Sequence, residues 1–228
     1  MGSTKDNLAV LFEDNHIIIV NKRPSDIVQG DKTGDKPLSD IVKEYIKEKY
    51  HKPGEVFLGV VHRLDRPTSG IIIFARTSKA LERLNKMFRE KLVQKKYWAV
   101  VKNKPKKEKD SLINFLKKNP KNNKSSVFKQ EIEGSKKAIL HYTTLKQLDN
   151  YTLLEIDLET GRHHQIRAQL SAIGSPIKGD LKYGFDRSNK DASIHLHARK
   201  IEFIHPVKKE KITITAPPPK EVIWEACL

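Results

Sequence analysis

The apolar residues of this chain fall into short runs that alternate between strand and helix spacing, and this alternation limits the possible folds. Runs such as "HIIIVN" and "GIIIFA" have the length of buried strands. Residues 37–50, and the segment that follows Thr77, carry apolar side chains at the three- and four-residue steps of amphipathic helices. Several strands are joined by turns too short for the crossovers of a doubly wound parallel sheet. The pattern therefore predicts an α+β fold with a mixed sheet.

The other segments extend this prediction. Strands are expected at 56–61 and 95–102, and a hairpin over 138–159. A helix is expected from about His163 to Ile173, ended by the glycine that follows it. The segment at about 102–124 contains nine lysines and two acidic residues, so we expect a solvated insertion with at most a short ordered piece.

The charge of the chain favours a polyanionic partner. The 228 residues include 44 Lys+Arg against 28 Asp+Glu, a formal net charge of +16. Such an excess suits nucleic acid, because neutralising phosphates releases condensed counterions. We find no basic amphipathic helix of the membrane-surface type, and the apolar runs are too short to span a bilayer. The single cysteine excludes a disulfide within the chain, and no apolar leader is seen, so a cytoplasmic protein is expected.

The stretch "VHRLDRPTSG", residues 61–70, places Asp65 between Arg63 and Arg66 on a loop. An aspartate, with a reference pKa of about 3.9, is ionised at neutral pH and is a poor general acid. It can still act as a nucleophile or stabilise a developing positive charge. A structural Arg-Asp-Arg cluster that pins the turn would give the same spacing, so both interpretations stay open at this point.

A second dense segment is "ETGRHHQIRAQLSAIGSPIKGDLKYG", residues 159–184. A helix that begins near His163 has an N-terminus that attracts anions, and Arg162 and Arg167 add fixed positive charge for a phosphate or for a carboxylate such as Asp65. The adjacent histidines His163 and His164 do not face each other on a helix and lack a third ligand, so no metal is expected.

Tyr97 lies within the expected strand 95–102, behind Lys95 and Lys96. A tyrosine in this position is more often a core or cross-strand residue than a functional one. Beside an RNA site, the same ring could stack on an unstacked base.

These motifs, in this order and spacing, resemble the RluA-type RNA pseudouridine synthases. The resemblance rests on "HRLDRPTSGIIIFART", "KKYWAVV", the segment 159–184 and "LHARKIEFIHP", and it runs from about Leu8 to Pro219. It implies isomerisation of uridine in RNA to pseudouridine, without cofactor or metal. It also implies a long mixed, mostly antiparallel sheet with flanking helices and a central active-site cleft.

The resemblance implies roles for individual residues. Asp65 falls on the catalytic aspartate of the family, Tyr97 on the tyrosine that stacks on uracil and is placed for proton transfer, and Arg167 on the arginine that pairs with the aspartate. We expect a flipped-out target nucleotide, and Arg63 could fill the vacated stack. The candidate RNA contacts are Arg63, Arg66, Lys96, Arg162 and His164.

Some features depart from the family pattern. Arg23 and Ser25-Asp26 stand where the family usually has Pro-Ala-Gly, and Gln169 stands where many relatives have histidine. We expect a catalytic domain over 8–219, with tails at 1–7 and 220–228 and without the S4-type RNA-binding domain of many relatives. A monomer without an obligate protein partner is expected, acting on a ribosomal or transfer RNA stem-loop.

Two functions from other classes compete with this one. A non-catalytic RNA-binding or assembly protein would show the same net charge, but it would not need Asp65, Tyr97 and Arg167 together. A metal-dependent nuclease would need clustered carboxylates, which the sequence lacks. The sequence favours the isomerase, and leaves open whether Asp65 attacks C1′ of the ribose or C6 of the base.

Overall fold

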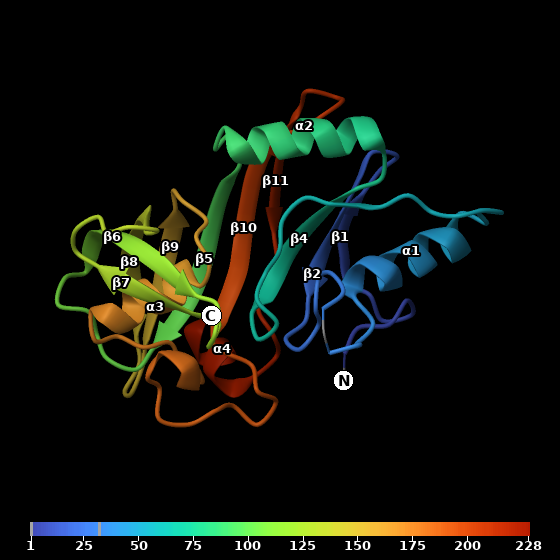
Figure 1. The fold of residues 1–228 in the computed structure, drawn as a ribbon. Helices are drawn as coiled ribbons and strands as arrows, with labels where there is room; N and C mark the ends of the chain where they lie inside the picture. The colour runs from blue at the N-terminus through green and yellow to red at the C-terminus, as the bar shows by residue number, and fades with distance from the viewer. Residues whose placement is uncertain (1, 32) are drawn as a thin grey trace. The chain divides into compact units, whose positions relative to one another are not determined.

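The computed structural model describes residues 2–31 and 33–228, and its eleven strands form one mixed, mostly antiparallel sheet accompanied by helices (Figure 1). The predicted α+β class is confirmed. The strands are β1 Val10–Glu13, β2 Ile17–Lys22, β3 Gly59–Val60, β4 Ser69–Ala75, β5 Gln94–Val101, β6 Lys109–Asn119, β7 Lys124–Phe128, β8 Lys136–Gln147, β9 Thr152–Leu158, β10 Leu196–Ile204 and β11 Lys211–Thr215. The helices are α1 Leu38–Lys49, α2 Ser78–Arg89, α3 Gln165–Ala172 and α4 Val222–Cys227, with a short 3-10 helix at Leu181–Tyr183.

The chain divides into two compact units. The first contains Met1–Val93 and Ala198–Pro219, and the second contains Gln94–His197 and Lys220–Leu228. Asp65 therefore belongs to the first unit, and Tyr97 and Arg167 belong to the second.

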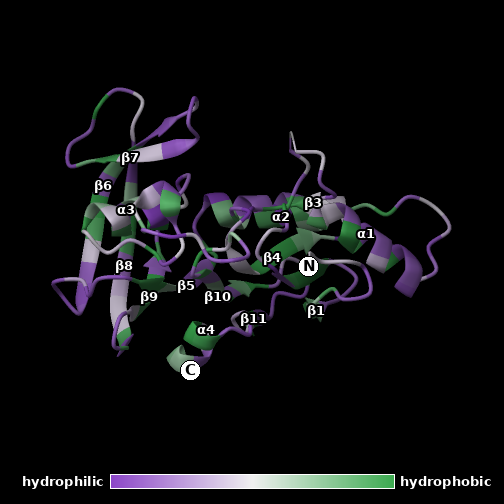
Figure 2. Ribbon diagram, turned by 90° about the horizontal axis from the view of Figure 1, so that it is seen from below, coloured by the Kyte–Doolittle hydropathy of each residue, from purple (hydrophilic) through white to green (hydrophobic). Residues whose placement is uncertain are grey.

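In the first unit, strands β2 and β4 are buried on both faces, which explains their continuous apolar sequences. Alternate residues of the two strands pack against opposite helices, because successive side chains of a strand point to opposite faces. Ile18 and Phe74 belong to the cluster that contains the apolar face of α1, whereas Ile19 and Ile73 pack with Leu84 of α2. Figure 2 shows the hydrophobic colour along β4. The Thr77 side chain caps α2 by accepting the Ala80 N–H.

Gly70, at the start of β4, allows a close approach to β10. It has a φ of +115°, and a Cβ built on it would lie 2.4 Å from the carbonyl oxygen of Ala198. No other residue could occupy this position without moving one of the strands. The strand that follows the Asp65 loop is thereby packed directly on a segment more than a hundred residues away in the sequence.

The second unit is built on five antiparallel strands in the order β5-β9-β8-β6-β7. Tyr97 of β5 pairs with Ile156 of β9, and the predicted hairpin over 138–159 is confirmed as β8 and β9. Helix α3 packs through Ala168 against the face that carries Leu116 and Ala138. Helix α4 packs through Trp224 near Val100 on β5.

Some sequence expectations are wrong in detail. The segment 102–124 is more ordered than the expected short piece, because β6 pairs with β8 over residues 109–116 and with β7 over residues 115–119. The expected buried strand at 56–61 is reduced to Gly59–Val60, and Phe57 is exposed. The expected tail 220–228 contains α4, whose Trp224 is buried.

Candidate functional site

Asp65 lies on the loop between β3 and β4, in a half-buried position. The loop closes as a turn, since the Thr68 N–H donates to the Asp65 carbonyl at 3.0 Å. Thr68 and Ser69 are buried immediately after it. The aspartate is thus accessible on a short loop whose C-terminal end is fixed in the sheet, whereas Arg63 is exposed.

The loop is also held by a buried lysine that sequence reasoning missed. Lys22, the last residue of β2, is 1% exposed, and its Nζ donates to the carbonyl oxygens of Arg23 at 2.9 Å and Arg66 at 3.1 Å. The Ser25 N–H donates to the same Arg66 carbonyl at 3.0 Å. Ser25 has a φ of +74°, a conformation that favours glycine, at the position where the sequence departs from the family's Pro-Ala-Gly. The residue next to Asp65 is therefore anchored through its main chain.

Burial lowers the pKa of Lys22 to about 7, from an ordinary value of 10.5. Loss of hydration is the main cause, and the nearby Arg66 guanidinium lowers the pKa further. The carboxylates of Asp26 and Asp65 act in the opposite direction and raise it. The charge of Asp65 is thus coupled to the charge of Lys22.

We expect the stability of the protein to rise with pH above neutrality because of Lys22. Its pKa in the folded protein, about 7, is below its unfolded value, so the unfolded chain binds more protons between pH 7 and 10.5. The free energy of unfolding should gain about 1.4 kcal/mol per pH unit in this range, to a total of about 5 kcal/mol. Urea unfolding at pH 7, 8 and 9 measures the gain. A Lys22→Met variant should lack it, and an equal gain in the variant would contradict the assignment.

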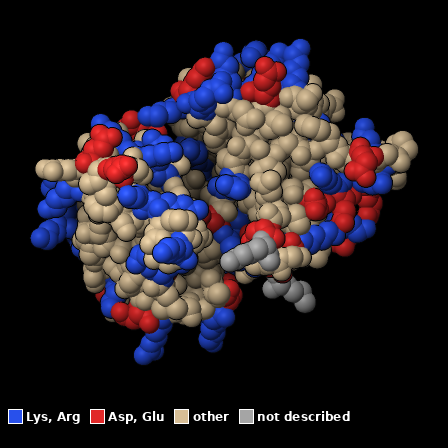
Figure 3. Space-filling view, viewed as in Figure 1, with Lys and Arg blue, Asp and Glu red and all other residues tan. Residues whose placement is uncertain are grey.

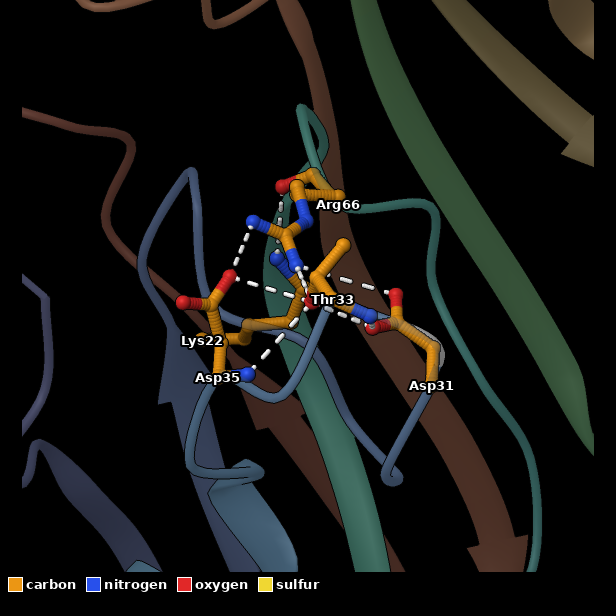
Figure 4. A network of polar contacts seen from close by, with 5 residues as sticks. All are labelled: Lys22, Asp31, Thr33, Asp35 and Arg66. Atoms are coloured by element: carbon orange, nitrogen blue, oxygen red, sulfur yellow. Dashed lines mark hydrogen bonds and ion pairs between the residues drawn. The ribbon is translucent and has the colours of Figure 1, made fainter.

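The Arg66 side chain takes part in an exposed polar network. Its Nη1 donates to Asp35 Oδ2 at 2.7 Å and its Nη2 donates to Thr33 Oγ1 at 2.8 Å (Figure 4). The Asp31 carboxylate lies 3.6 Å from Nη2. The sequence did not predict this network, because its partners lie more than thirty residues from Arg66.

In the second unit, Tyr97 is buried in the middle of β5. The neighbouring Lys96 pairs with Glu155 of β9 at 2.5 Å. The Nζ of Lys95 lies 3.8 Å from the position that a Cβ on Gly161 would occupy, in the loop before α3. Burial lowers the pKa of this lysine. Two lysines therefore precede the predicted tyrosine at the N-terminal end of its strand.

Arg167 of α3 makes a bidentate ion pair with Asp180. Its Nε donates to Oδ2 at 2.7 Å and its Nη2 to Oδ1 at 2.8 Å. The two side chains are 6% and 1% exposed, and the Tyr183 ring centroid lies 5.1 Å from the guanidinium carbon. The sequence does not single out Asp180, which follows a glycine in the dense segment 159–184. The predicted pairing of Arg167 with Asp65 stays a prediction.

The predicted residues at the start of α3 differ in accessibility. His164 is buried in a left-handed conformation, its Nδ1 3.0 Å from the Tyr183 hydroxyl, which in turn accepts the Ser125 N–H at 2.8 Å. Arg162 is exposed, and its Nε donates to the Lys137 carbonyl at 2.8 Å. Of these two candidate RNA contacts, Arg162 is the more accessible.

Within residues 2–31 and 33–228, no group of three or more His, Cys, Asp or Glu side chains is arranged to hold a metal ion. Among the helices of that same part of the chain, none has the length and apolar character needed to cross a membrane.

Comparison with known protein sequences gives a family match. A profile of the family described as RNA pseudouridylate synthase matches residues 16–172, which include Asp65, Tyr97 and Arg167. An uncharacterized RNA pseudouridine synthase of Synechocystis is 32% identical over 93% of this chain and 66% of its own length. Ribosomal large subunit pseudouridine synthase C of Buchnera aphidicola (subspecies Schizaphis graminum) is 37% identical over 91% and 66%. The chain thus spans about two thirds of the length of these relatives.

Two solved structures share the fold. Human RNA Pseudouridylate Synthase Domain Containing 4 has a TM-score of 0.79 and 22% identity, covering 96% of this chain and 91% of that one. Human RNA Pseudouridylate Synthase Domain Containing 1 has a TM-score of 0.76 at 22% identity, covering 100% and 90%. The predicted pseudouridine synthase fold is confirmed.

Proposed function

Since the chain belongs to the RluA-type family of RNA pseudouridine synthases, we propose that it is an isomerase that converts uridine in RNA to pseudouridine. The observation that carries this proposal is the family match over residues 16–172, within which all three predicted catalytic residues lie. A relative 37% identical is named for the large ribosomal subunit, so we take ribosomal RNA of that subunit as the first substrate to test and a transfer RNA stem-loop as the second.

The reaction moves the ribose bond from N1 to C5 of the same base, so no atom or electron has to come from a cofactor. The bond between N1 and C1′ breaks, the base turns, and C5 forms the new bond to C1′. C5 then loses its proton to a base, and N1 takes up a proton. Asp65 acts as the nucleophile, either on C1′ or on C6, and a half-buried carboxylate on an anchored loop suits either route.

Tyr97 and Arg167 have supporting roles in the proposed reaction. Tyr97 stacks on the uracil ring and accepts the C5 proton. Arg167 is the cation that orients Asp65. Because Asp180 already neutralises Arg167, this arginine can be buried without depending on the Asp65 carboxylate for its charge balance.

RNA would be bound mainly through its phosphates. Figure 3 shows groups of Lys and Arg scattered over the face it draws, with fewer Asp and Glu among them, which fits the net charge of +16. The proposed contacts are Arg63, Arg66, Lys96, Arg162 and His164, on a catalytic domain that spans residues 8–219. We propose further that the target nucleotide is flipped out of its stack, and that the protein acts as a cytoplasmic monomer.

Tritium release tests the proposed activity. RNA labelled at uridine C5 loses tritium to water when C5 forms a carbon–carbon bond, so we expect release from large-subunit ribosomal RNA incubated with the protein. Digestion of the same RNA to nucleosides should yield pseudouridine in an amount equal to the tritium released. Transcripts of transfer RNA, labelled in the same way, form the second arm.

The competing function is a non-catalytic RNA-binding protein with the same fold. It predicts that the chain retains both RNAs on a filter but releases no tritium from either of them. That result would overturn the proposed activity, and release without pseudouridine in the digest would do the same.

A further inference from the structure

Arg66, the residue after Asp65, is held in two different ways. Its main-chain carbonyl accepts hydrogen bonds from the buried Lys22 Nζ at 3.1 Å and from the Ser25 N–H at 3.0 Å. Its guanidinium, in contrast, is bound by the loop that contains Asp31, Thr33 and Asp35, and all of these contacts lie at the surface (Figure 4). The main chain of Arg66 is thus fixed, while the groups that bind its guanidinium, among residues 2–31 and 33–228, are exposed.

Exposure decides how firmly the guanidinium is held. The side chain of Arg66 is 38% exposed, and the side chains of Asp31 and Asp35 are 44% and 58% exposed. Water and salt screen such pairs, so they stabilise a structure little and exchange easily. The main-chain contacts with Lys22 are partly buried, and Lys22 itself is 1% exposed, so they are screened less. The loop that contains Asp31, Thr33 and Asp35, called the acidic loop below, is therefore a weak anchor for Asp65. It is also an exchangeable partner for the Arg66 side chain.

The two carboxylates are chemically similar to the ligand expected here. A guanidinium binds carboxylates and phosphates through the same parallel hydrogen bonds. The hydrogen bond from Arg66 is the main reason that the pKa of Asp35 is lowered, and hydrogen bonds from Thr33 do the same for Asp31. Both groups are thus acceptors that remain charged well below neutral pH.

We propose that Asp31 and Asp35 occupy the Arg66 guanidinium in the RNA-free protein in place of an RNA phosphate, and that RNA must displace them to bind there. This inference rests on the proposed function. RNA that places a phosphate at Arg66 replaces the ion pairs that Arg66 loses. RNA that places no phosphate there encounters two carboxylates beside the candidate nucleophile. The acidic loop consequently discriminates against RNA that is not positioned for reaction.

The test is a binding measurement with Asp31→Asn/Asp35→Asn and a fluorescein-labelled 12-nucleotide oligo(A). We expect affinity for this non-substrate RNA to rise on the order of 3- to 10-fold at 0.1 M salt, because Arg66 becomes available for phosphate. In an Arg66→Ala background, the same two substitutions should change affinity no more than a charge-matched control does. That control is Glu44→Gln/Glu48→Gln, which removes two lysine-paired carboxylates from α1.

Several outcomes would overturn the proposal. An increase equal to that of the α1 control would show a general charge effect, and an increase that persists without Arg66 would show a site elsewhere. A fall in kcat on ribosomal RNA, with oligo(A) affinity unchanged, would show that the loop positions Asp65 instead. Oligo(A) binding does not need turnover, so this result is separate from the tritium-release test, whose failure would overturn only the proposed activity.

Discussion

Asp65→Asn is expected to reduce tritium release from ribosomal RNA by on the order of 1,000-fold or more, because the amide keeps the shape of the side chain but is not a nucleophile. RNA binding should change little, since a carboxylate does not bind phosphate. The folded structure should persist, because Lys22 and Ser25 anchor the loop through the main-chain carbonyl of Arg66. Single-turnover release and filter binding, measured on the same RNA, give the two quantities.

A control variant separates the chemistry of Asp65 from its effect on Lys22. Both Asp26 and Asp65 raise the pKa of Lys22, and Asp26 has the larger effect. Asp26→Asn should therefore lower the stability at neutral pH at least as much as Asp65→Asn does, while turnover stays within about tenfold of wild type. Equal losses of turnover in the two variants would mean that Asp65 acts through Lys22 and is not the nucleophile.

Arg167→Met is expected to lower the free energy of unfolding by about 3–5 kcal/mol and to impair turnover as well. The substitution leaves the Asp180 carboxylate, which is 1% exposed, without the guanidinium that compensates its burial. Chemical denaturation measures the loss. Lys102→Met, which breaks the exposed pair with Asp186 in the same unit, is the matched control and should cost less than about 1 kcal/mol.

A double variant distinguishes the structural role of Arg167 from its proposed role in the reaction. Arg167→Met/Asp180→Leu removes both charges, so it should be more stable than either single variant. Turnover should not return with stability, because the cation proposed to orient Asp65 is still missing. Wild-type turnover in the stable double variant would leave Arg167 with a structural role only.

The sequence predicted strands β2 and β4 of the first unit well, because their signals are local. The runs around Ile18 and Ile72 are apolar on both faces, and such runs have the length of buried strands. The pair β6 and β7 was missed for the opposite reason. Only one face of β6 is buried, through Leu112 and Leu116, while lysines and the 55% exposed Ile113 occupy the other face and its ends. The many charged residues of this segment made the alternation of buried and exposed side chains along β6 hard to recognise in the sequence.

The candidate site was predictable only where a motif marks it. Asp65 and Arg167 lie in motifs, and their proposed roles follow from the resemblance. The importance of Lys22 and Asp180 depends on contacts that sequence does not display. Lys22 ends an apolar strand and would be expected to reach solvent, yet a loop more than forty residues later covers it. The exposed bonds between Arg66 and the acidic loop likewise exist only in the folded chain.

The return of the chain to the first unit sets a limit on when that unit can form during synthesis. Strand β4 needs β10 beside it, as the contact of Gly70 with Ala198 shows, and β10 in turn pairs with β11, which ends at Thr215. A ribosome adds on the order of 5–20 residues per second, so the N-terminal segment waits several seconds for these strands. The second unit is largely contiguous and can fold first. The strand that follows the Asp65 loop therefore lacks its neighbour until residues up to about Thr215 have emerged, and a product truncated before β10 would lack the strand that packs on Gly70.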